Sequence, residues 1–415
     1  MDLVNKIEHF FNIHINEYLD FHRKMVEINS FTANPEGVNK LGQYIAQEFS
    51  KLGFSAEFIQ SLHVGYGKHL FLTHPATYHK NQPTIAMISH LDTVFPEDEE
   101  IKHNFLWRVD GDRIYGPGSV DIKGGTALIF MIMQAMQNLT RQQFNQINWL
   151  ICLNASEEAL SDDFSRFCLE RMPKNTLGCL VFEGGAADKT SMQIVTSRKG
   201  RVTFHVVVEG KSAHAGNYHA KGANAIVQIA HTILEIADLT DYDEKLTFNV
   251  GKVNGGVVVN RVPHYAEAEV EMRAFSPEVF EKAVNDIMAL SSKTKVHSRD
   301  GFSCKVKIIK GKQTYPWPRN QDTDYLFNIW QKAGRKLAID VVHEARGGLS
   351  DGNMLWKHFP TLDGLGPTGE NAHCSELDPA TGKDQEFVLA SSFIPKAMLN
   401  IIAILELIEQ NEGKV

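Results

Sequence analysis

The sequence predicts a mixed α/β protein, in which helices cover both faces of a largely parallel β-sheet and a smaller α+β domain is inserted into the chain. Two observations lead to this fold class. Short apolar segments alternate with helical segments up to about residue 185, which is the pattern of a parallel sheet between helices. Near residue 200 the order becomes β-α-β-β-α-β, the split β-α-β arrangement of a small separate domain.

The first domain is expected to begin with two amphipathic helices. One covers roughly the first 30 residues. In the other, Leu41, Ile45 and Phe49 recur at helical spacing, and Gly53 supplies a C-terminal stop. Strands are then predicted at 69–73, 84–89, 147–153 and 178–182, and helices at 126–137 and 161–171. Ligands bind at the carboxyl ends of strands in sheets of this kind, so polar residues that follow these strands are candidates for function.

The inserted domain is predicted over 198–311, which leaves 1–197 and 312–415 as a discontinuous first domain. Its expected elements are strands at 201–209, 246–253, 265–273 and 303–310 and helices at 222–237 and 277–291. A length of roughly 110 residues is ordinary for a domain. The α/β alternation resumes after the proline-containing turn at 315–318, and a C-terminal helix is predicted over 386–409.

Composition places the chain among ordinary globular proteins. It has 415 residues, of which 22% are charged and 43% hydrophobic. The formal net charge of -8 disfavours nucleic acid and anionic membranes, which both attract basic proteins. Residues 1–8 are too polar for a signal peptide, and no run approaches about 18 apolar residues, so neither a signal peptide nor a membrane span is expected. The five cysteines include no C-x-x-C pair, which fits a reducing, cytoplasmic location.

A loop over residues 116–125 is at the centre of the predicted site. Its sequence, Gly-Pro-Gly-Ser-Val-Asp-Ile-Lys-Gly-Gly, precedes an apolar helical run and carries one carboxylate, Asp121. A carboxylate has two oxygens, so a single residue can bridge two metal ions about 3.5–4 Å apart. We interpret Asp121 as such a bridging ligand, on which the other acidic and histidine motifs converge.

Two pairs of polar residues follow predicted strands directly. His90 and Asp92 come after the strand at 84–89, and alternate residues of an extended segment point the same way, so one can bind metal while the other orients it. Such a histidine is more often only structural when no other motif accompanies it. Glu157 and Glu158 follow another buried strand. They either favour the start of a helix through its dipole, or supply a metal ligand, Glu158, and a general base and acid, Glu157.

Two further candidates lie near glycines. Glu183 follows the strand at 178–182 and precedes two glycines, which leave room for a ligand. His373 lies in a glycine-containing loop at 366–376. Its neighbour Cys374 is expected to be a free thiol and not a ligand, because nitrogen and oxygen ligands already complete the set.

Taken together, these motifs resemble those of the co-catalytic dizinc aminoacylase and carboxypeptidase family, which includes acetylornithine deacetylase, succinyl-diaminopimelate desuccinylase, aminoacylases, peptidase T and glutamate carboxypeptidases. The resemblance extends over nearly the whole chain, and the bacterial glutamate carboxypeptidases are the most similar branch. It is carried by Ser89–Val94, Gly116–Gly118, Asp121–Gly125, Glu157–Glu158, Glu183–Gly184, Gly210–Gly216, Asn260–Pro263, Glu271–Arg273 and the loop of His373. It implies a zinc-exopeptidase-like catalytic domain with an inserted lid and dimerisation domain.

The resemblance implies five metal ligands, one of which bridges two zinc ions. The implied sets are His90 with Glu183, Glu158 with His373, and Asp121 between them. Glu157 would be the catalytic base, and Asp92 would orient His90. Cobalt or manganese would also suit a site of nitrogen and oxygen ligands. A cis peptide bond is expected between Asp121 and Ile122.

The inserted domain would supply further residues and a dimer interface. His214 would reach the active site of the partner subunit in a homodimer and stabilise the oxyanion. Asn260 and Arg273 would bind the free carboxylate of the substrate, Arg273 through a bidentate fork. Without the resemblance, Arg273 is more simply a surface charge on an alternating strand, and His214 a loop residue.

A glycine-rich segment at 344–353 resembles the substrate loop of the family, which makes Arg346 and Gly348 candidates for substrate binding. The arginine is shifted by one residue relative to the glutamate carboxypeptidases. The sequence therefore leaves open whether Arg346 meets the substrate's carboxylate or its side chain. Arg198 marks the entry to the inserted domain, and its role beyond a hinge is also left open.

The sequence therefore predicts a dizinc hydrolase that cleaves an amide bond next to a free carboxylate, with release of C-terminal glutamate as the leading specificity. The alternative is an N-acyl-amino-acid deacylase, a dipeptidase or a tripeptidase-type aminopeptidase of the same family, although no acid for an aminopeptidase substrate's ammonium group is identified. A non-catalytic metal-binding relative is the remote alternative, since Glu157 and all five ligands are present. The expected partners are a small peptide or N-acyl amino acid and a second copy of the chain.

Overall fold

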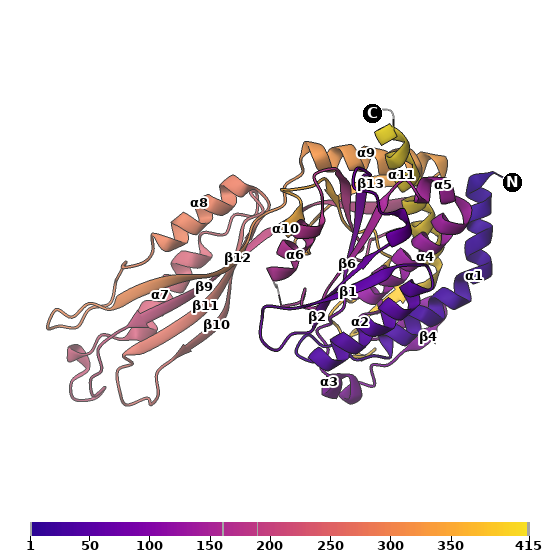
Figure 1. The fold of residues 1–415 in the computed structure, drawn as a ribbon. Helices are drawn as coiled ribbons and strands as arrows, with labels where there is room; N and C mark the ends of the chain where they lie inside the picture. The colour runs from indigo at the N-terminus through magenta and orange to yellow at the C-terminus, as the bar shows by residue number, and fades with distance from the viewer. Residues whose placement is uncertain (1, 160–161, 189, 413–415) are drawn as a thin grey trace. The chain divides into compact units, whose positions relative to one another are not determined.

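The structure, a computed structural model, describes residues 2–159, 162–188 and 190–412. The chain forms two compact units, drawn in Figure 1. Unit 1 comprises Met1–Thr196, Arg319–Ala345 and Ser350–Val415, and unit 2 comprises Ser197–Pro318 with Arg346–Leu349. The predicted inserted domain, 198–311, lies within unit 2, which extends further along the chain than that prediction.

The central sheet of unit 1 is mixed and largely parallel, as predicted. Its strands in spatial order are β1 (Ser55–Gln60), β2 (Lys68–Thr73), β6 (Asn148–Asn154), β3 (Thr84–His90), β7 (Thr176–Val181) and β14 (Thr361–Leu362). β3 runs parallel to β6 and β7, whereas β1 and β2 are antiparallel. The carboxyl ends of β3, β6 and β7 therefore lie at one edge of the sheet, where His90 pairs with Asn154.

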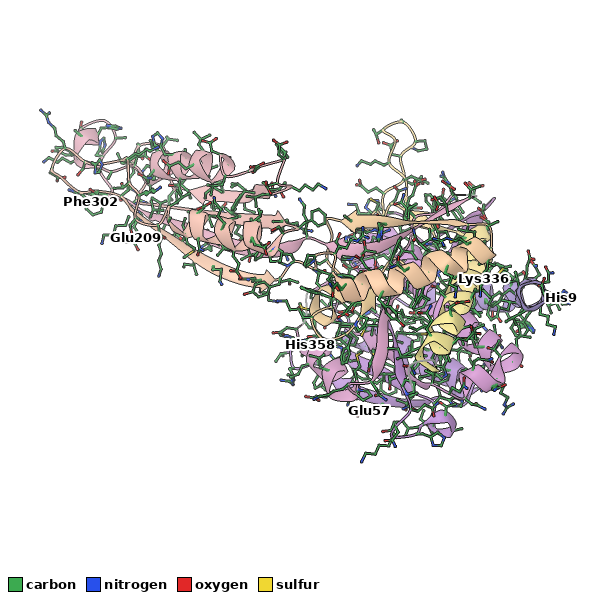
Figure 2. All side chains as sticks on the ribbon, turned by 90° about the horizontal axis from the view of Figure 1, so that it is seen from above. His9, Glu57, Glu209, Phe302, Lys336 and His358 are labelled. Carbon is green, nitrogen blue, oxygen red and sulfur yellow. The ribbon has the colours of Figure 1, made fainter. Side chains whose placement is uncertain are left out.

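Hydrophobic layers cover both faces of this sheet. Alternate residues of β3 point to opposite faces, so Met87 packs into the larger core and Ile88 into the smaller one. The larger core includes side chains of α1 (Leu3–Val26), α2 (Pro35–Ser50), α4 (Gly124–Leu139), α9 (Gln321–Lys336) and α11 (Phe393–Glu412), and the smaller core those of α6 (Asp163–Arg171) and α10 (Gly352–Leu355). α9 and α11 lie side by side, and Lys336 of α9 pairs with Glu406 of α11 (Figure 2).

The C-terminal helix lies in the larger core. Over Ala390–Asn411 the chain is long and apolar enough to cross a membrane, and 83% of the most apolar window is buried inside the fold. The core helix of a folded domain satisfies the same criteria of length and hydropathy. The packing of Ile401, Ile404 and Leu407 into the core accounts for the apolar character of this segment.

The predicted helix over 386–409 is wrong at its beginning. Phe387–Leu389 form a strand, β16, because they pair with β5 in a small separate sheet. The order of this sheet is β15 (Gly369–Glu370), β16, β5 (Arg113–Tyr115) and β4 (Arg108–Asp110). Strands of two or three residues give no periodic signal, so only pairing across the chain reveals them.

The remaining elements of the described chain are short connections and a second small sheet. They are α3 (Glu97–Lys102), α5 (Arg141–Phe144), the single turns at Pro75–Thr77, Ser119–Lys123, His219–Lys221 and Ala390–Ser392, and the two-stranded sheet of β8 (Ser191–Arg198) and β13 (Asp340–Arg346).

Unit 2 has the predicted β-α-β-β-α-β order. Its antiparallel sheet has the spatial order β10 (Thr247–Gly255), β11 (Tyr265–Ala274), β9 (Gly200–Glu209) and β12 (Lys305–Thr314), and its helices are α7 (Ala225–Ala237) and α8 (Pro277–Met288). Val202, Phe204 and Val206 alternate along β9 and pack with both helices in one core. The opposite face of the sheet carries the polar residues.

Candidate metal centre

The structure brings the five predicted ligands together in unit 1. His90 ends β3, Glu158 follows β6 and Glu183 follows β7, so the three come from adjacent strand ends. Asp121 comes from the turn before α4, and His373 from the loop between β15 and β16. The three residues that follow or end these strands therefore lie at one edge of the sheet, as the sequence predicted.

The ligand atoms form two groups that share Asp121. His90 Nε2 lies 3.1 Å from Asp121 Oδ1 and 3.9 Å from Glu183 Oε1. His373 Nε2 lies 3.2 Å from Asp121 Oδ2 and 3.1 Å from Glu158 Oε1. The two oxygens of one carboxylate therefore face two different histidines, which is what a bridging ligand requires.

Electrostatics in this cluster favour added positive charge. Hydrogen bonds to Asp121 and Glu158 raise the pKa of His373 to about 11. Burial alone would raise the pKa of Asp121, but hydrogen bonds with His373 and His90 outweigh it and lower this pKa. Burial and the neighbouring Asp121 raise the pKa of Glu158. A site in which carboxylates outnumber the histidines suits divalent cations, which would compete with protons for His373.

Asp92 contacts the loop that follows β6 as well as His90. Its Oδ1 accepts the N–H of Glu157 at 3.0 Å, and its Oδ2 accepts the N–H of Glu158 at 3.2 Å and the hydroxyl of Thr32 at 2.7 Å. His90 Nδ1 lies 2.9 Å from the backbone carbonyl of Asp92 and 3.5 Å from its carboxylate. A carbonyl only accepts, so we assign the proton to Nδ1, which leaves Nε2 as the ligand atom.

Glu157 lies beside the ligand groups but belongs to neither. Burial raises its pKa well above the usual range; His90 opposes this shift, and Asp351 and Glu183 add to it. Asp351 is a buried residue that sequence reasoning missed. It accepts a hydrogen bond of 2.8 Å from Asn154 Nδ2, and burial raises its pKa to about 7. A glutamate with a raised pKa next to a cluster of candidate metal ligands suits proton transfer.

The backbone adopts unusual conformations at both loops of the site. The peptide bond between Asp121 and Ile122 is cis, as expected from the resemblance. A Cβ on Gly125 would lie 2.0 Å from the Phe182 carbonyl oxygen, so only glycine lets the start of α4 approach the end of β7. His373 has φ of 66°, a left-handed conformation that costs about 1–2 kcal/mol for a residue with a side chain. Such strain is concentrated at functional sites.

A third group of potential ligands lies apart from these two. It consists of His63, Asp162 and Asp163. The Asp163 carboxylate accepts hydrogen bonds from Ser61 and Leu62 and lies 3.2 Å from His69 Nε2. The other ring nitrogen of His69 accepts the N–H of Ala155 at 3.1 Å. These hydrogen bonds hold the loop that carries Glu157 and Glu158 in place. We assign no metal to the group of His63, Asp162 and Asp163. Cys374 is exposed and belongs to none of the three groups.

His214 and Asn260 lie together in unit 2. The exposed His214 ring accepts at Nδ1 the N–H groups of Gly216 at 3.2 Å and Asn217 at 3.1 Å. In the neutral ring the proton therefore lies on Nε2, which is left as a donor. The carbonyl of Asn260 accepts the N–H of Ala215 at 3.0 Å, which holds the two loops side by side.

Arg273 contacts the glycine-rich segment. Its Nε donates to Glu271 at 2.6 Å, and its Nη1 donates to the carbonyl of Gly347 at 2.9 Å. Burial alone would raise the pKa of Glu271, but hydrogen bonds from Arg273 and Arg201 outweigh it and lower this pKa. The strand arginine and the glycine-rich segment, far apart in sequence, are thus brought together within unit 2.

The structure gives Arg198 a definite contact. Its buried Nη1 donates to the carbonyls of Gly348 and Leu349, each at 3.0 Å. The N–H of Lys199 donates to the carbonyl of Arg346 at 3.0 Å. Arg198 therefore fastens the segment Arg346–Leu349 to the end of β8, where unit 2 begins, a role that no local sequence pattern indicates.

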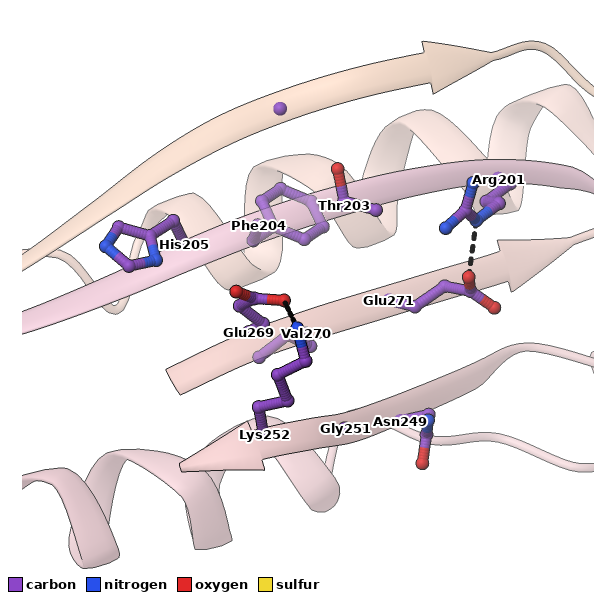
Figure 3. Close-up of a pocket in the computed structure, with 11 residues that line it drawn as sticks. Arg201, Thr203, Phe204, His205, Asn249, Gly251, Lys252, Glu269, Val270 and Glu271 are labelled. Carbon is purple, nitrogen blue, oxygen red and sulfur yellow. Dashed lines mark hydrogen bonds and ion pairs between the residues drawn. The ribbon is translucent and has the colours of Figure 1, made fainter. Parts of the chain in front are cut away.

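A pocket of about 430 Å³ lies on the open face of the unit 2 sheet (Figure 3). Charged side chains in it pair with one another: Arg201 with Glu271, and Lys252 with Glu269 at 3.2 Å. None of its lining residues is a predicted metal ligand. Because its charges are mutually neutralised, we interpret the pocket as a polar sheet surface and not as the reaction centre.

Comparison with known proteins agrees with this architecture. Residues 196–299 match the family described as the peptidase dimerisation domain. Carboxypeptidase G2 from Pseudomonas sp. (strain RS-16) is 26% identical over 357 residues, which cover 86% of this chain and 82% of that protein. The chain is thus similar to a peptidase over most of its length and contains a match to a peptidase dimerisation domain. The resemblance seen in the sequence motifs is thereby confirmed, and the chain is a metal-dependent peptidase.

Solved structures share the fold of this chain. The aminopeptidase PepT from Bacillus cereus ATCC 10987 superposes with a TM-score of 0.75 at 20% identity, covering 95% of this chain and 98% of that one. A dinuclear metal binding peptidase of the M20 family from Bacillus subtilis superposes with a TM-score of 0.63 at 15% identity, covering 96% and 99%. At these identities the likeness shows the fold alone.

Proposed function

We propose that this chain is a dizinc carboxypeptidase, which hydrolyses the amide bond next to the free C-terminal carboxylate of a small peptide and prefers C-terminal glutamate. The observation that carries the proposal is the Asp121 carboxylate, whose two oxygens face two ligand groups. Nitrogen and oxygen ligands around a shared carboxylate are the arrangement that two neighbouring divalent ions need.

Each residue of the cluster then has a role. The ions would be held by His90 and Glu183, by Glu158 and His373, and by Asp121 between them. When bound, they would polarise the scissile carbonyl and lower the pKa of the attacking water. Glu157 takes the proton from that water and delivers it to the leaving amine, as general base and then general acid. Its pKa, raised by burial, suits both steps.

Substrate recognition is assigned to unit 2. Asn260 and Arg273 bind the substrate's α-carboxylate, and the Nε2–H of His214, which acts in the partner subunit's site, donates to the oxyanion. Arg346, in the segment fastened by Arg198, is assigned to the side-chain carboxylate of glutamate. The contact of Arg273 with Gly347 supports this assignment, because it places the two arginines in one part of unit 2.

Metal-restored protein should hydrolyse peptides with C-terminal glutamate faster than any other class of substrate. The measurement is kcat/KM on C-terminal glutamate peptides, their C-terminal amides, N-acetyl amino acids and free-amine dipeptides, before and after zinc or cobalt is returned to chelator-stripped protein. The amides should lose at least about tenfold in kcat/KM, because an arginine–carboxylate pair contributes about 1.5–3 kcal/mol.

Three other results of this substrate comparison would contradict parts of the proposal. Metal-dependent preference for N-acetyl substrates or dipeptides would contradict the carboxypeptidase and favour a deacylase or dipeptidase. Equal rates on acids and amides would contradict the roles of Asn260 and Arg273. Absence of turnover with two metals bound would favour a metal-binding protein without this activity.

We also propose that unit 2 forms a homodimer with a second copy of the chain. β10 is an edge strand, and α7 packs beside it. Large apolar side chains are exposed on both, among them Val227 at 45%, Leu234 at 64% and Val253 at 52%. Exposed apolar groups beside a free strand edge are typical of an interface, and the match to a dimerisation domain supports this use.

The double variant Val227→Asp with Leu234→Asp should be monomeric at micromolar concentration, where the unchanged chain is dimeric, because two buried charges without partners would oppose association. Light scattering after size exclusion measures this. The control is Ile309→Asp, an exposed apolar position on the opposite edge strand β12, which should leave the dimer intact. A dimer that survives the double variant would place the interface elsewhere.

The five cysteines are all unpaired in the structure. This supports the proposal of a reducing, cytoplasmic location, in which free thiols persist.

A further inference from the structure

The small sheet of unit 1 connects two ligand loops that are far apart in sequence. β5 leads into the loop of Asp121, and β15 leads into the loop of His373. β16 lies between them and pairs with both, Phe387 with Tyr115 on one side and with Glu370 on the other. A residue at the head of β16 can therefore contact both loops at once.

Glu386 occupies this position and makes both contacts. Its side-chain Oε1 accepts the N–H of Val120 at 2.9 Å and the N–H of Asp121 at 3.1 Å. Its own N–H donates to the carbonyl of Cys374 at 2.8 Å, next to His373. Glu386 is fully buried, so water does not compete for these bonds.

The second carboxylate oxygen of Glu386 is buried and has no hydrogen-bond partner among the described residues. A buried polar atom without a partner destabilises a fold, so a residue chosen for stability alone would not be a glutamate here. The contribution of Glu386 lies in its other oxygen, which fixes two consecutive N–H groups at the bridging ligand.

We propose that Glu386 is a positioning residue that sets the separation of Asp121 and His373, and with it the metal position formed by Asp121, Glu158 and His373. The inference rests on the proposed dizinc function. The loops of Asp121 and His373 both contribute to this metal position, whereas the position of His90 and Glu183 shares only Asp121 with them. Loss of Glu386 should therefore weaken the first position more than the second. Groups that support metal ligands in this way typically contribute 10–100-fold to metal affinity.

The test compares two neutral replacements of similar size. Glu386→Gln keeps an oxygen acceptor, whereas Glu386→Met removes it. Zinc content after dialysis at buffered free zinc, and cobalt titration followed by absorbance, should show two metals of unchanged affinity in Glu386→Gln. Glu386→Met should keep one tight metal and bind the second roughly 10–100-fold more weakly. Its kcat/KM should fall at limiting zinc and recover at excess zinc.

Control variants distinguish a positioning role of Glu386 from a general effect of replacing a buried glutamate. Glu406→Gln removes another buried glutamate, on α11 outside the site, and should leave both affinities unchanged. If Glu386→Met does not fold, Glu386→Asp tests the same point, since it shortens the reach to the two N–H groups by one methylene. Two metals of unchanged affinity in a folded Met or Asp variant would overturn the positioning role alone. An unchanged protein that binds only one metal would overturn the proposed dizinc function itself.

Discussion

Replacing Glu157 by glutamine should reduce kcat by roughly 10³-fold while two metal ions remain bound, because a general base contributes 10²–10⁴-fold and Glu157 belongs to neither ligand group. Glutamine has nearly the same size and leaves the backbone bond from Glu157 N–H to Asp92 intact. The variant therefore removes the proton acceptor and little else. The measurement is kcat on the best substrate, with the metal content of the same sample.

The shorter Glu157→Asp variant is the matched comparison. It retains a carboxylate at a changed distance, so its kcat should fall between those of the unchanged chain and the glutamine variant. Near-normal turnover in Glu157→Gln with both metals bound would show that another group moves the proton, and Asp351 would be the next candidate because burial raises its pKa to about 7. Loss of metal in Glu157→Gln would instead make Glu157 a ligand.

Asp92→Asn should lower kcat by roughly 10²-fold and metal affinity by 10–100-fold, although it changes one atom. The two oxygens of Asp92 accept N–H groups from consecutive residues, Glu157 and Glu158. An amide offers one oxygen and one NH₂ group. Whichever way it turns, a donor faces a donor, so the loop that holds the base and a ligand must shift. Metal titration and kcat/KM, with a thermal melt of the same protein, measure the effect.

Thr32→Val is a milder variant for comparison with Asp92→Asn. It removes only the hydroxyl that donates to Asp92 Oδ2 and leaves both backbone bonds in place. We expect a loss of less than about tenfold in kcat/KM, in line with about 1 kcal/mol for one hydrogen bond. If Asp92→Asn were as mild as Thr32→Val, Asp92 would act on His90 alone and not as the support of the glutamate loop.

Most of the ligand cluster could be predicted because its residues follow strands. A buried apolar run such as 84–89 is visible in the sequence, and the edge at which parallel strands end is fixed by their common direction. His90, Glu158 and Glu183 are therefore placed by local pattern and general rules of sheet topology. The assignment of the five ligands to two metal ions could not be made from these patterns. It came from the resemblance to a family.

The small sheet and its contacts could not be predicted. β15 and β16 have two and three residues, too few for a periodic signal, and the error at the start of the C-terminal helix has the same cause. Nothing in the local sequence marks Glu386, which contacts a residue 265 positions away. Arg198 likewise acts on a segment 150 positions away. Thr32 contacts Asp92 across a gap of 60 residues.

The sequence by itself determined the fold class and the residue types available for metal binding and proton transfer, because periodicity and side-chain chemistry are local properties. Only the tertiary structure decided that the two oxygens of Asp121 face different histidines, that Asp92 holds the loop of both glutamates, and that Glu386 joins two ligand loops. These are properties of distance and direction between segments far apart in the chain. They are set by the packing of the whole domain, about which a local pattern carries no information.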